Sequence, residues 1–406
     1  MSHESTLIAT LAVGFVLALL LGMGAARLKM PPLVGFLLAG VVMSPYTPGF
    51  SGDTHLASEL AEVGVILLMF GVGMHFSIED LLAVKRIAIP GAVLQIIVAT
   101  LLAAVLVHLW GWGWGAAIIF GLALSVASTV VLLRMLEERG LLASPDGRIA
   151  VGWLVVEDLA MVLALVLLPP FAQLAGGTSA GHDAAPAAGG SLLWSVLTTI
   201  GKVALFSVLA LVVGKRVMPW LLRKVSQTGS RELFTLAVLA VSLGIAYGSA
   251  ELFDVSFALG AFFAGMILNE SELCHQAATQ SLPLQDAFAV LFFVSVGMLF
   301  DPAILVQHPL EVLATVLVIV VGKSLAALLI VLAFGRPLRT ALLISASLGQ
   351  IGEFSFILAG LGLEFGLLPK EGRDLILAGA ILSIALNPLL FRLVGAMSPA
   401  PAQAAA

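Results

Sequence analysis

The chain has 406 residues, of which 60% are hydrophobic and only 11% are charged. Soluble domains carry about 25% charged residues, so this chain has too few polar side chains to cover a water-facing globule. A soluble enzyme and a disordered chain are therefore excluded. The net charge is −5, which gives no sign of nucleic-acid binding, and the single cysteine, Cys274, excludes a disulfide framework and a cysteine metal cluster.

Apolar segments separated by charged residues, prolines and glycines follow one another along the whole chain. A membrane-spanning helix needs about 20 mostly apolar residues. On this basis we predict thirteen spans, in chain order 7–26, 33–43, 60–74, 87–110, 116–136, 149–168, 192–213, 233–250, 255–268, 287–299, 312–334, 341–363 and 375–394. The first follows His3 and Glu4 instead of a positively charged segment, so we expect a spanning helix and no cleaved signal.

The distribution of lysine and arginine predicts the orientation. With the N-terminus outside, 15 of these residues fall on the cytoplasmic side, 2 outside (Lys370 and Arg373) and 2 within spans (Lys202 and Lys323), which accounts for all 19. Positive charge is retained on the cytoplasmic side of membranes. We therefore expect a multi-pass protein with its N-terminus outside and its C-terminus in the cytoplasm.

Two short motifs recur at nearly the same offset. The sequence GFLLAG at 35–40 resembles GAFFAG at 260–265, and VGMHF at 72–76 resembles VGMLF at 296–300, offsets of 225 and 224 residues. One helix between two six-helix copies would invert the second copy, as in many secondary transporters. We predict an all-α polytopic fold with two inverted repeats, at 1–170 and 225–396. They are joined by a flexible outer loop at 171–191 and a linker helix at 192–224, and a disordered tail at 397–406 follows.

Charged residues lie at the centres of two predicted spans. Glu157 and Asp158 flank the midpoint of 149–168, and Lys323 is the midpoint of 312–334. Charge inside the bilayer is costly and usually functional. A carboxyl group away from water favours its protonated form, so one such group can hold either a proton or a monovalent cation, but not both. We expect Lys323 to neutralise Asp158 when the site is empty; the alternative is a purely structural ion pair.

Two further spans carry polar groups and glycines at their centres. They are Ser125, Ser128 and Thr129 in one and the sequence GQIGEFS at 349–355, with Gln350 and Glu353, in the other. Such residues loosen the helical hydrogen-bond ladder, so we predict two broken helices that cross and direct backbone carbonyls and helix ends at one cavity. The hydroxyls could instead serve in packing, and Glu353 could cap a helix end instead of binding the ion.

These motifs together resemble the second monovalent cation:proton antiporter superfamily. Residues 155–160 (VVEDLA) resemble its acidic motif, 122–129 and 349–355 resemble its crossing-helix motifs, and Lys323 matches its membrane lysine. The closest likeness within it is to the Kef-type potassium:proton antiporters, in particular the YbaL-like branch. The resemblance covers about residues 6–396.

The resemblance implies a homodimer in the bacterial inner membrane, with a dimerisation domain and a core domain that moves as an elevator. It implies that Asp158 binds the ion and that Ser128 and Thr129 lie beside it, with Glu157, Ser125, Lys323, Gln350 and Glu353 in support. Many Kef-type proteins have Gln-Asp in place of Glu157-Asp158. They also continue into a cytoplasmic nucleotide-binding domain, so we expect this chain to be the transport part of a longer protein.

Other functional classes leave other patterns. A channel should show a pore-lining polar face or a repeated filter loop, and a membrane enzyme a nucleophile-base or metal motif; neither pattern is present in the sequence. We therefore predict K⁺/H⁺ antiport with no cofactor. A Na⁺/H⁺ antiporter of the same fold, a ligand-gated K⁺ efflux channel and an inverted-repeat symporter for organic anions remain alternatives.

Overall fold

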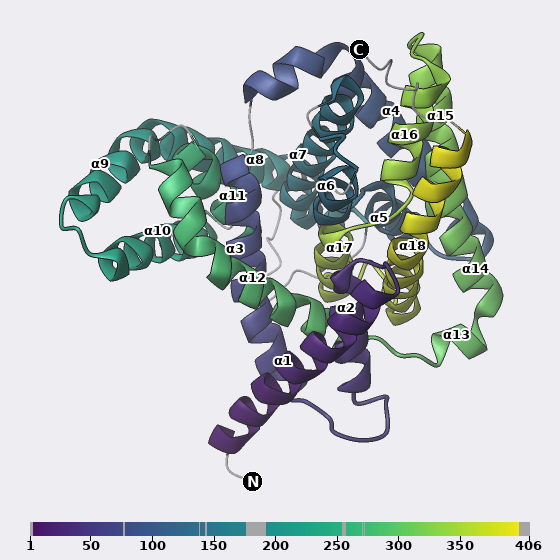
Figure 1. The fold of residues 1–406 in the computed structure, drawn as a ribbon, viewed down its shortest axis with the longest axis horizontal. Helices are drawn as coiled ribbons and strands as arrows, with labels where there is room; N and C mark the ends of the chain where they lie inside the picture. Colours follow the sequence, from purple (N-terminus) through teal and green to yellow (C-terminus); the bar gives the residue numbers. More distant parts are fainter. Residues whose placement is uncertain are drawn as a thin grey trace, which may run out of the picture.

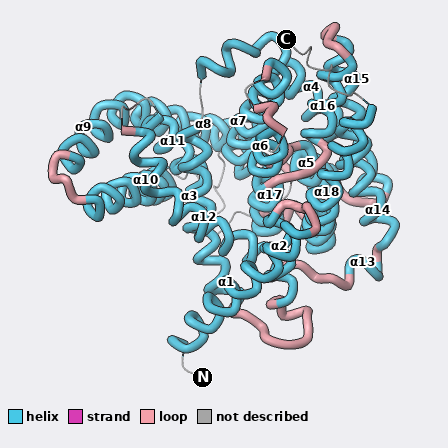
Figure 2. The backbone as a smooth tube through the Cα atoms, viewed as in Figure 1, coloured by secondary structure: helices cyan, strands magenta, loops and turns pink. Residues whose placement is uncertain are grey.

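The structure, a computed structural model, describes residues 3–75, 78–137, 139–142, 144–175, 192–253, 257–269, 271 and 273–397. These residues form helices joined by short connections, without a strand among them (Figure 2). In the first half of the chain the helices are α1 (His3–Arg27), α2 (Pro32–Val42), α3 (Thr54–His75), α4 (Ile78–Leu109), α5 (Trp114–Ser125), α6 (Thr129–Glu137), α7 (Pro145–Leu174), α8 (Leu192–Leu209) and α9 (Lys215–Ser226).

The second half continues with α10 (Arg231–Phe253), α11 (Phe257–Asn269), α12 (Cys274–Met298), α13 (Ile304–Gln307), α14 (Pro309–Leu317), α15 (Ser324–Ala333), α16 (Leu338–Leu348), α17 (Glu353–Glu364) and α18 (Lys370–Met397). Two π-helical turns interrupt long helices: η1 (Ala210–Gly214) joins α8 to α9, and η2 (Val318–Lys323) joins α14 to α15. Such wide turns are frequent at functional sites.

Many of these helices suit a bilayer. Among the described residues, eight are long and apolar enough to cross a membrane, or nine if α16 and α17 are counted as one bent span. Three shorter apolar helices, α2, α5 and α11, accompany them. The predicted class, an all-α multi-pass membrane protein, is confirmed.

The helices form two bundles. The first, which we call the scaffold bundle, consists of α1, α2, α3, α10, α11 and α12, with α9 packed against α10 and α11. The second, the crossing bundle, consists of α4 to α7 and α14 to α18, and the bundles touch each other sparsely. Figure 1 shows them on opposite sides of the molecule, with α1 beginning at one end and α18 finishing at the other. Each bundle combines helices from both halves of the chain.

Glycines hold the scaffold helices together at closest approach. Gly40 of α2 lies directly on Gly297 of α12, and Gly73 of α3 on Gly265 of α11. A Cβ atom added at any of these glycines would run into the backbone of the opposite helix. Small residues of this kind allow membrane helices to approach backbone to backbone.

The structure corrects several predicted boundaries. The helix predicted at 287–299 begins already at Cys274, and the helix predicted at 149–168 runs from Pro145 to Leu174, which takes in the start of the loop predicted at 171–191. Residues 176–191 of that loop and 398–406 of the predicted tail lie outside the described residues. The early start of α12 is the largest change, because it turns a predicted connection into membrane helix.

Candidate ion-binding site

Two helices are broken at the middle of the crossing bundle, as the sequence predicts. Residues 126–128 separate α5 from α6, and residues 349–352 separate α16 from α17, whose axes differ by 43°. The breaks touch each other: a Cβ atom on Gly352 would lie 2.5 Å from the Cα atom of Ser128. Only glycine permits this approach, so the residue at 352 sets how closely the two chains cross.

Breaking a helix leaves backbone N–H and C=O groups without intrahelical partners, and in a membrane these must be satisfied by protein. The side chain of Gln350 satisfies both backbone groups of Ser128. It accepts a hydrogen bond from the backbone nitrogen of Ser128 at 2.9 Å and donates one to the carbonyl oxygen of Ser128 at 3.2 Å. Ser355 donates to the carbonyl oxygen of Ala123 at 2.5 Å. The two breaks are thereby joined into one hydrogen-bonded unit.

Buried amides at the centres of neighbouring helices complete the unit. Gln95 of α4 donates to the carbonyl oxygen of Ser125, and Asn387 of α18 donates to that of Ala346, both at 2.9 Å. Neither residue was among our predicted site residues. The signal that could have found them is a lone amide inside an otherwise apolar span.

Asp158 lies beside the first break. Its Oδ2 atom accepts a hydrogen bond of 3.0 Å from the hydroxyl of Thr129, the first residue of α6, and its Oδ1 atom has no hydrogen-bond partner among the described residues. Glu353, in the first turn of α17, has no hydrogen-bond partner for either carboxylate oxygen within the described part of the chain. The side chains are 4% and 2% exposed. Helix N-termini carry partial positive charge. Asp158 lies beside the N-terminus of α6 and Glu353 at the N-terminus of α17, so the charged form of each carboxylate is favoured.

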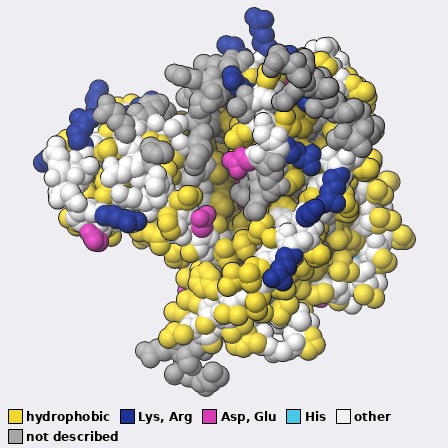
Figure 3. Space-filling model, in the orientation of Figure 1, with side chains coloured by type: hydrophobic (Ala, Val, Ile, Leu, Met, Phe, Trp, Pro, Cys, Tyr) yellow, Lys and Arg dark blue, Asp and Glu magenta, His cyan; other side chains and the backbone are white. Residues whose placement is uncertain are grey.

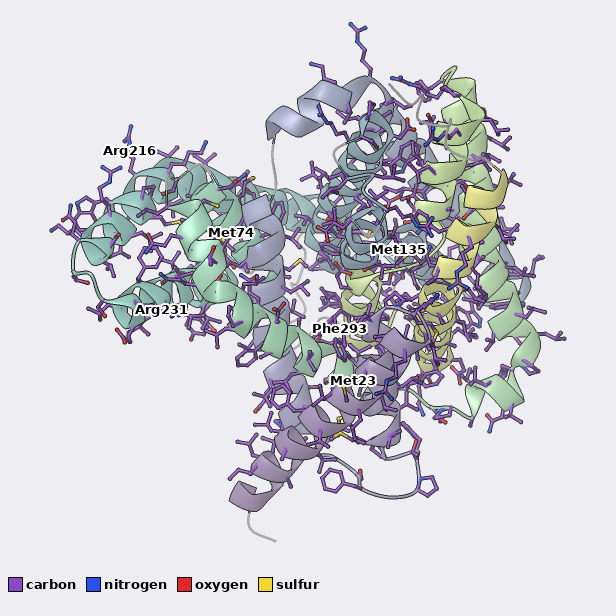
Figure 4. All side chains as sticks on the ribbon, viewed as in Figure 1. Met23, Met74, Met135, Arg216, Arg231 and Phe293 are labelled. Atoms are coloured by element: carbon purple, nitrogen blue, oxygen red, sulfur yellow. The ribbon has the colours of Figure 1, made fainter. Side chains whose placement is uncertain are left out.

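These three residues line one cavity of about 510 Å³ between the two bundles. Its other wall comes from α2, α3, α11 and α12, including Phe293, which lies near the boundary between α12 and the crossing bundle (Figure 4). The residues that line this single cavity therefore include two acids, with three carboxylate oxygens that lack partners among the described residues, and one hydroxyl group. Oxygen atoms of this kind are ligands for hard cations.

Glu157 and Lys323 lie behind this cavity, and neither lines it. Glu157 accepts a hydrogen bond of 2.8 Å from the backbone nitrogen of Ala127, and Lys323 donates one of 2.8 Å to the carbonyl oxygen of Gln350. The acid whose charge acts on Lys323 is Glu157. Our expectation that Lys323 neutralises Asp158 stays a prediction; in this structure Lys323 donates to the backbone of one break, and Glu157 accepts from the backbone of the other.

The predicted hydroxyls separate into two groups. Thr129 faces the cavity, whereas Ser125 donates to the carbonyl oxygen of Leu122 within its own helix, and the hydroxyl of Ser128 accepts from the backbone of Val131. Ser125 and Ser128 thus stabilise helix ends and lie outside the cavity lining. Gln350 joins the two breaks through its hydrogen bonds with Ser128. Glu353, for which two roles were open, lines the cavity, and both roles stay predictions.

The described residues hold no group of three or more histidine, cysteine or acidic side chains arranged for a metal ion. A pair of crossed, broken helices with buried acids at their junction, inside a multi-pass membrane protein, defines the class of ion-coupled secondary transporters. Its open acidic site between two bundles is suited to a small cation.

The comparisons identify the family within this class. The family described as "Sodium/hydrogen exchanger, transmembrane" matches residues 14–394, and the chain belongs to it. The YbaL protein of Escherichia coli (strain K12), assigned by its name to the cation/proton antiporters, is 61% identical over 97% of this chain and 69% of its own length. K(+) efflux antiporter 4 of Arabidopsis thaliana is 34% identical over 96% of this chain and 64% of its own length.

A solved structure shows the same fold. The sodium proton antiporter MjNhaP1 from Methanocaldococcus jannaschii superimposes with a TM-score of 0.72, at 17% sequence identity, over 97% of this chain and all of that chain. The named relatives are transporters and not enzymes, which confirms the predicted class.

Proposed function

We propose that this chain exchanges a monovalent cation, K⁺ in preference to Na⁺, for a proton, and that the two compete for Asp158. The three partnerless oxygens of Asp158 and Glu353 in one cavity carry the proposal. A buried carboxylate is stable only if a proton or a cation neutralises it. Because either ion excludes the other from the same oxygens, each conformational cycle would carry one ion in each direction.

The pair behind the cavity supports a single exchanging group. Glu157 and Lys323 offset each other's charge. Glu157 also accepts a hydrogen bond from the backbone nitrogen of Ala127 at one break, and Lys323 donates one to the carbonyl oxygen of Gln350 at the other. We assign these two residues to maintaining the crossing, and Asp158, Thr129 and Glu353 to holding the ion.

The cavity supports access from one side at a time. Its lining includes Pro31 and Pro32 at the start of α2 and Val151 of α7, near the ends that the lysine and arginine distribution assigns to the cytoplasm. Beyond Glu353, Phe356 of α17 packs against Phe293 of α12 with ring centroids 6.4 Å apart. We infer an inward-facing state, in which the aromatic contact closes the outer route and an elevator movement of the crossing bundle would open it.

Contacts between the halves of the chain support inverted repeats. Gly40 and Gly265 correspond at the offset of 225 residues, and Gly73 and Gly297 at 224. Gly40 packs on Gly297, whereas Gly265 packs on Gly73. Each packing pair is therefore the repeat-related image of the other, as a two-fold axis within the fold requires.

Thirteen spans are consistent with the same helices. The described helices would give thirteen spans: the eight long helices, the bent pair α16 and α17 as one, the three short apolar helices (with α5 completed by α6) and the 30-residue α7. An odd number agrees with α1 beginning and α18 finishing at opposite ends (Figure 1). We retain the predicted orientation, with the N-terminus outside, in the bacterial inner membrane.

The preference for K⁺ derives from the relatives named as K(+) efflux antiporters. The chain spans about two thirds of the length of several of these proteins, so a cytoplasmic regulatory domain stays a proposal, as does a homodimer formed through the scaffold bundle. Cross-linking of the chain in membranes would test the dimer directly.

The exchange itself is tested in proteoliposomes with a pH-sensitive dye inside. We expect K⁺, and more weakly Na⁺, to release protons from wild type, and Asp158→Asn to abolish this because an amide cannot take up a proton and a cation alternately. Since protons compete for the same oxygens, the apparent KM for the cation should rise as pH falls. Full activity of Asp158→Asn, or no cation-dependent signal from wild type at any pH, would contradict the proposal.

A further inference from the structure

A third carboxylate faces the cavity from the opposite wall. Asp286 belongs to α12, whose apolar span covers residues 276–298 and has its midpoint at (276 + 298)/2 = 287. Asp286 is therefore within about 1.5 Å of the middle of the span along the helix axis. Its side chain is exposed and lines the cavity. An exposed acid at this depth requires an aqueous surrounding, because lipid would not tolerate it.

The charges of the cavity all have the same sign. Among the described lining residues, Asp158, Glu353 and Asp286 are acidic, and none is a lysine or arginine. Asp286 makes no hydrogen bond or ion pair with another described residue. Its neighbour Gln285, by contrast, is buried and donates to the hydroxyl of Ser281 at 2.9 Å. A cavity with low-dielectric walls and one sign of charge concentrates counterions.

Asp286 belongs to a different bundle from the other two acids of the cavity. Asp158 and Glu353 lie on α7 and α17 of the crossing bundle, whereas α12 packs against α2 and α3 in the scaffold bundle. Figure 3 shows acidic side chains near the boundary between the two parts on this face. In an elevator movement the first two acids would leave the cavity together, and Asp286 would remain.

We propose that Asp286 is a cation-recruiting residue of the scaffold bundle, which draws a hydrated monovalent cation into the inward-facing cavity before Asp158 and Glu353 bind it. This inference rests on the proposed exchange function. Because Asp286 faces the ion site in one conformational state only, its charge acts on one side of the membrane. The apparent KM for the cation on the cavity side depends on Asp286, and the KM on the other side does not.

The test compares everted and right-side-out membrane vesicles that contain wild type, Asp286→Asn, Asp286→Glu or Glu232→Gln. The last variant removes the same charge from an exposed residue at the start of α10, outside the cavity lining, and controls for general surface potential. Initial rates of K⁺-driven proton movement are measured at about 10 mM and about 1 M ionic strength, adjusted with a bulky organic cation. The screening length falls from about 30 Å to 3 Å over this range.

With Asp286→Asn we expect the cavity-side KM to rise about three- to tenfold at low ionic strength, with kcat within about twofold of wild type. The difference should disappear at high ionic strength, Asp286→Glu should restore the wild-type KM, and the melting temperature should not change. An unchanged KM, an equal rise on both sides or the same rise in Glu232→Gln would overturn the inference while leaving the exchange proposal intact. Absence of exchange by wild type would overturn both.

Discussion

The contact between the two helix breaks gives the sharpest prediction, which concerns Gly352→Ala. The added methyl group would lie 2.5 Å from the Cα atom and 2.8 Å from the nitrogen of Ser128, which are backbone atoms that cannot rotate away. Overpacking of this kind costs about 1–3 kcal/mol. Separating the breaks would also strain the two hydrogen bonds between Gln350 and Ser128, worth about 0.5–1.5 kcal/mol each. The total destabilisation is therefore about 2–6 kcal/mol.

The assay combines thermal unfolding in detergent with dye-based transport in proteoliposomes. Gly360→Ala is the matched control, because Gly360 lies in the same helix, α17, and has no atom within 4 Å of its added Cβ. We expect Gly360→Ala to keep or slightly raise the melting temperature, since alanine favours helix. Gly352→Ala should melt several degrees lower and lose transport, because separation of the breaks moves Thr129 away from Asp158. Equal melting temperatures and rates for the two variants would refute the reasoning.

Two further predictions follow from the site. Lys323→Met leaves the charge of Glu157 uncompensated and should destabilise the protein by about 3–5 kcal/mol; adding Glu157→Gln should recover much of this in thermal unfolding, and additive losses would contradict the pairing. Thr129→Val removes the hydrogen bond to Asp158 and should raise the cation KM several-fold, whereas Ser125→Ala, which loses only a bond within its own helix, should leave KM within about twofold. Equal effects of the two substitutions on KM would place the ion elsewhere.

The sequence alone was sufficient for the two broken helices and for the position of Glu157 and Asp158 near the middle of a long helix. Glycines, hydroxyls and an acid or amide clustered at a span centre predict a break, because they weaken the helical ladder and offer polar partners to the freed backbone groups. The residues around 126–128 and 349–352 illustrate this. It was harder to predict which of the two acids pairs with Lys323. Glu157 and Asp158 point about 100° apart, and nothing in one sequence fixes which of them turns toward Lys323.

The start of α12 was missed for a different reason. The polar residues Gln276, Gln280 and Gln285, together with Pro283 and Asp286, lower the hydropathy of 274–286, so the sequence favours a connection there. In the structure this stretch is helix: Gln285 and Asp286 line the cavity, and Gln280 accepts a hydrogen bond of 3.4 Å from Thr235 of α10. Hydropathy measures suitability for lipid. Averaged over 276–298 the helix is still apolar enough to span a membrane, so its early start was missed because the polar residues are concentrated in its first half.

The glycine contacts of the scaffold bundle also limit how the molecule can move. At Gly40 with Gly297 and at Gly73 with Gly265 the backbones meet with no side chain between them. Sliding either helix by one residue, a rise of about 1.5 Å, would drive a neighbouring Cβ atom into the facing backbone. These two contacts therefore hold the scaffold helices in fixed positions relative to one another. Any large displacement of one part of the protein against the other must occur between the two bundles, where side chains separate the helices and the cavity lies.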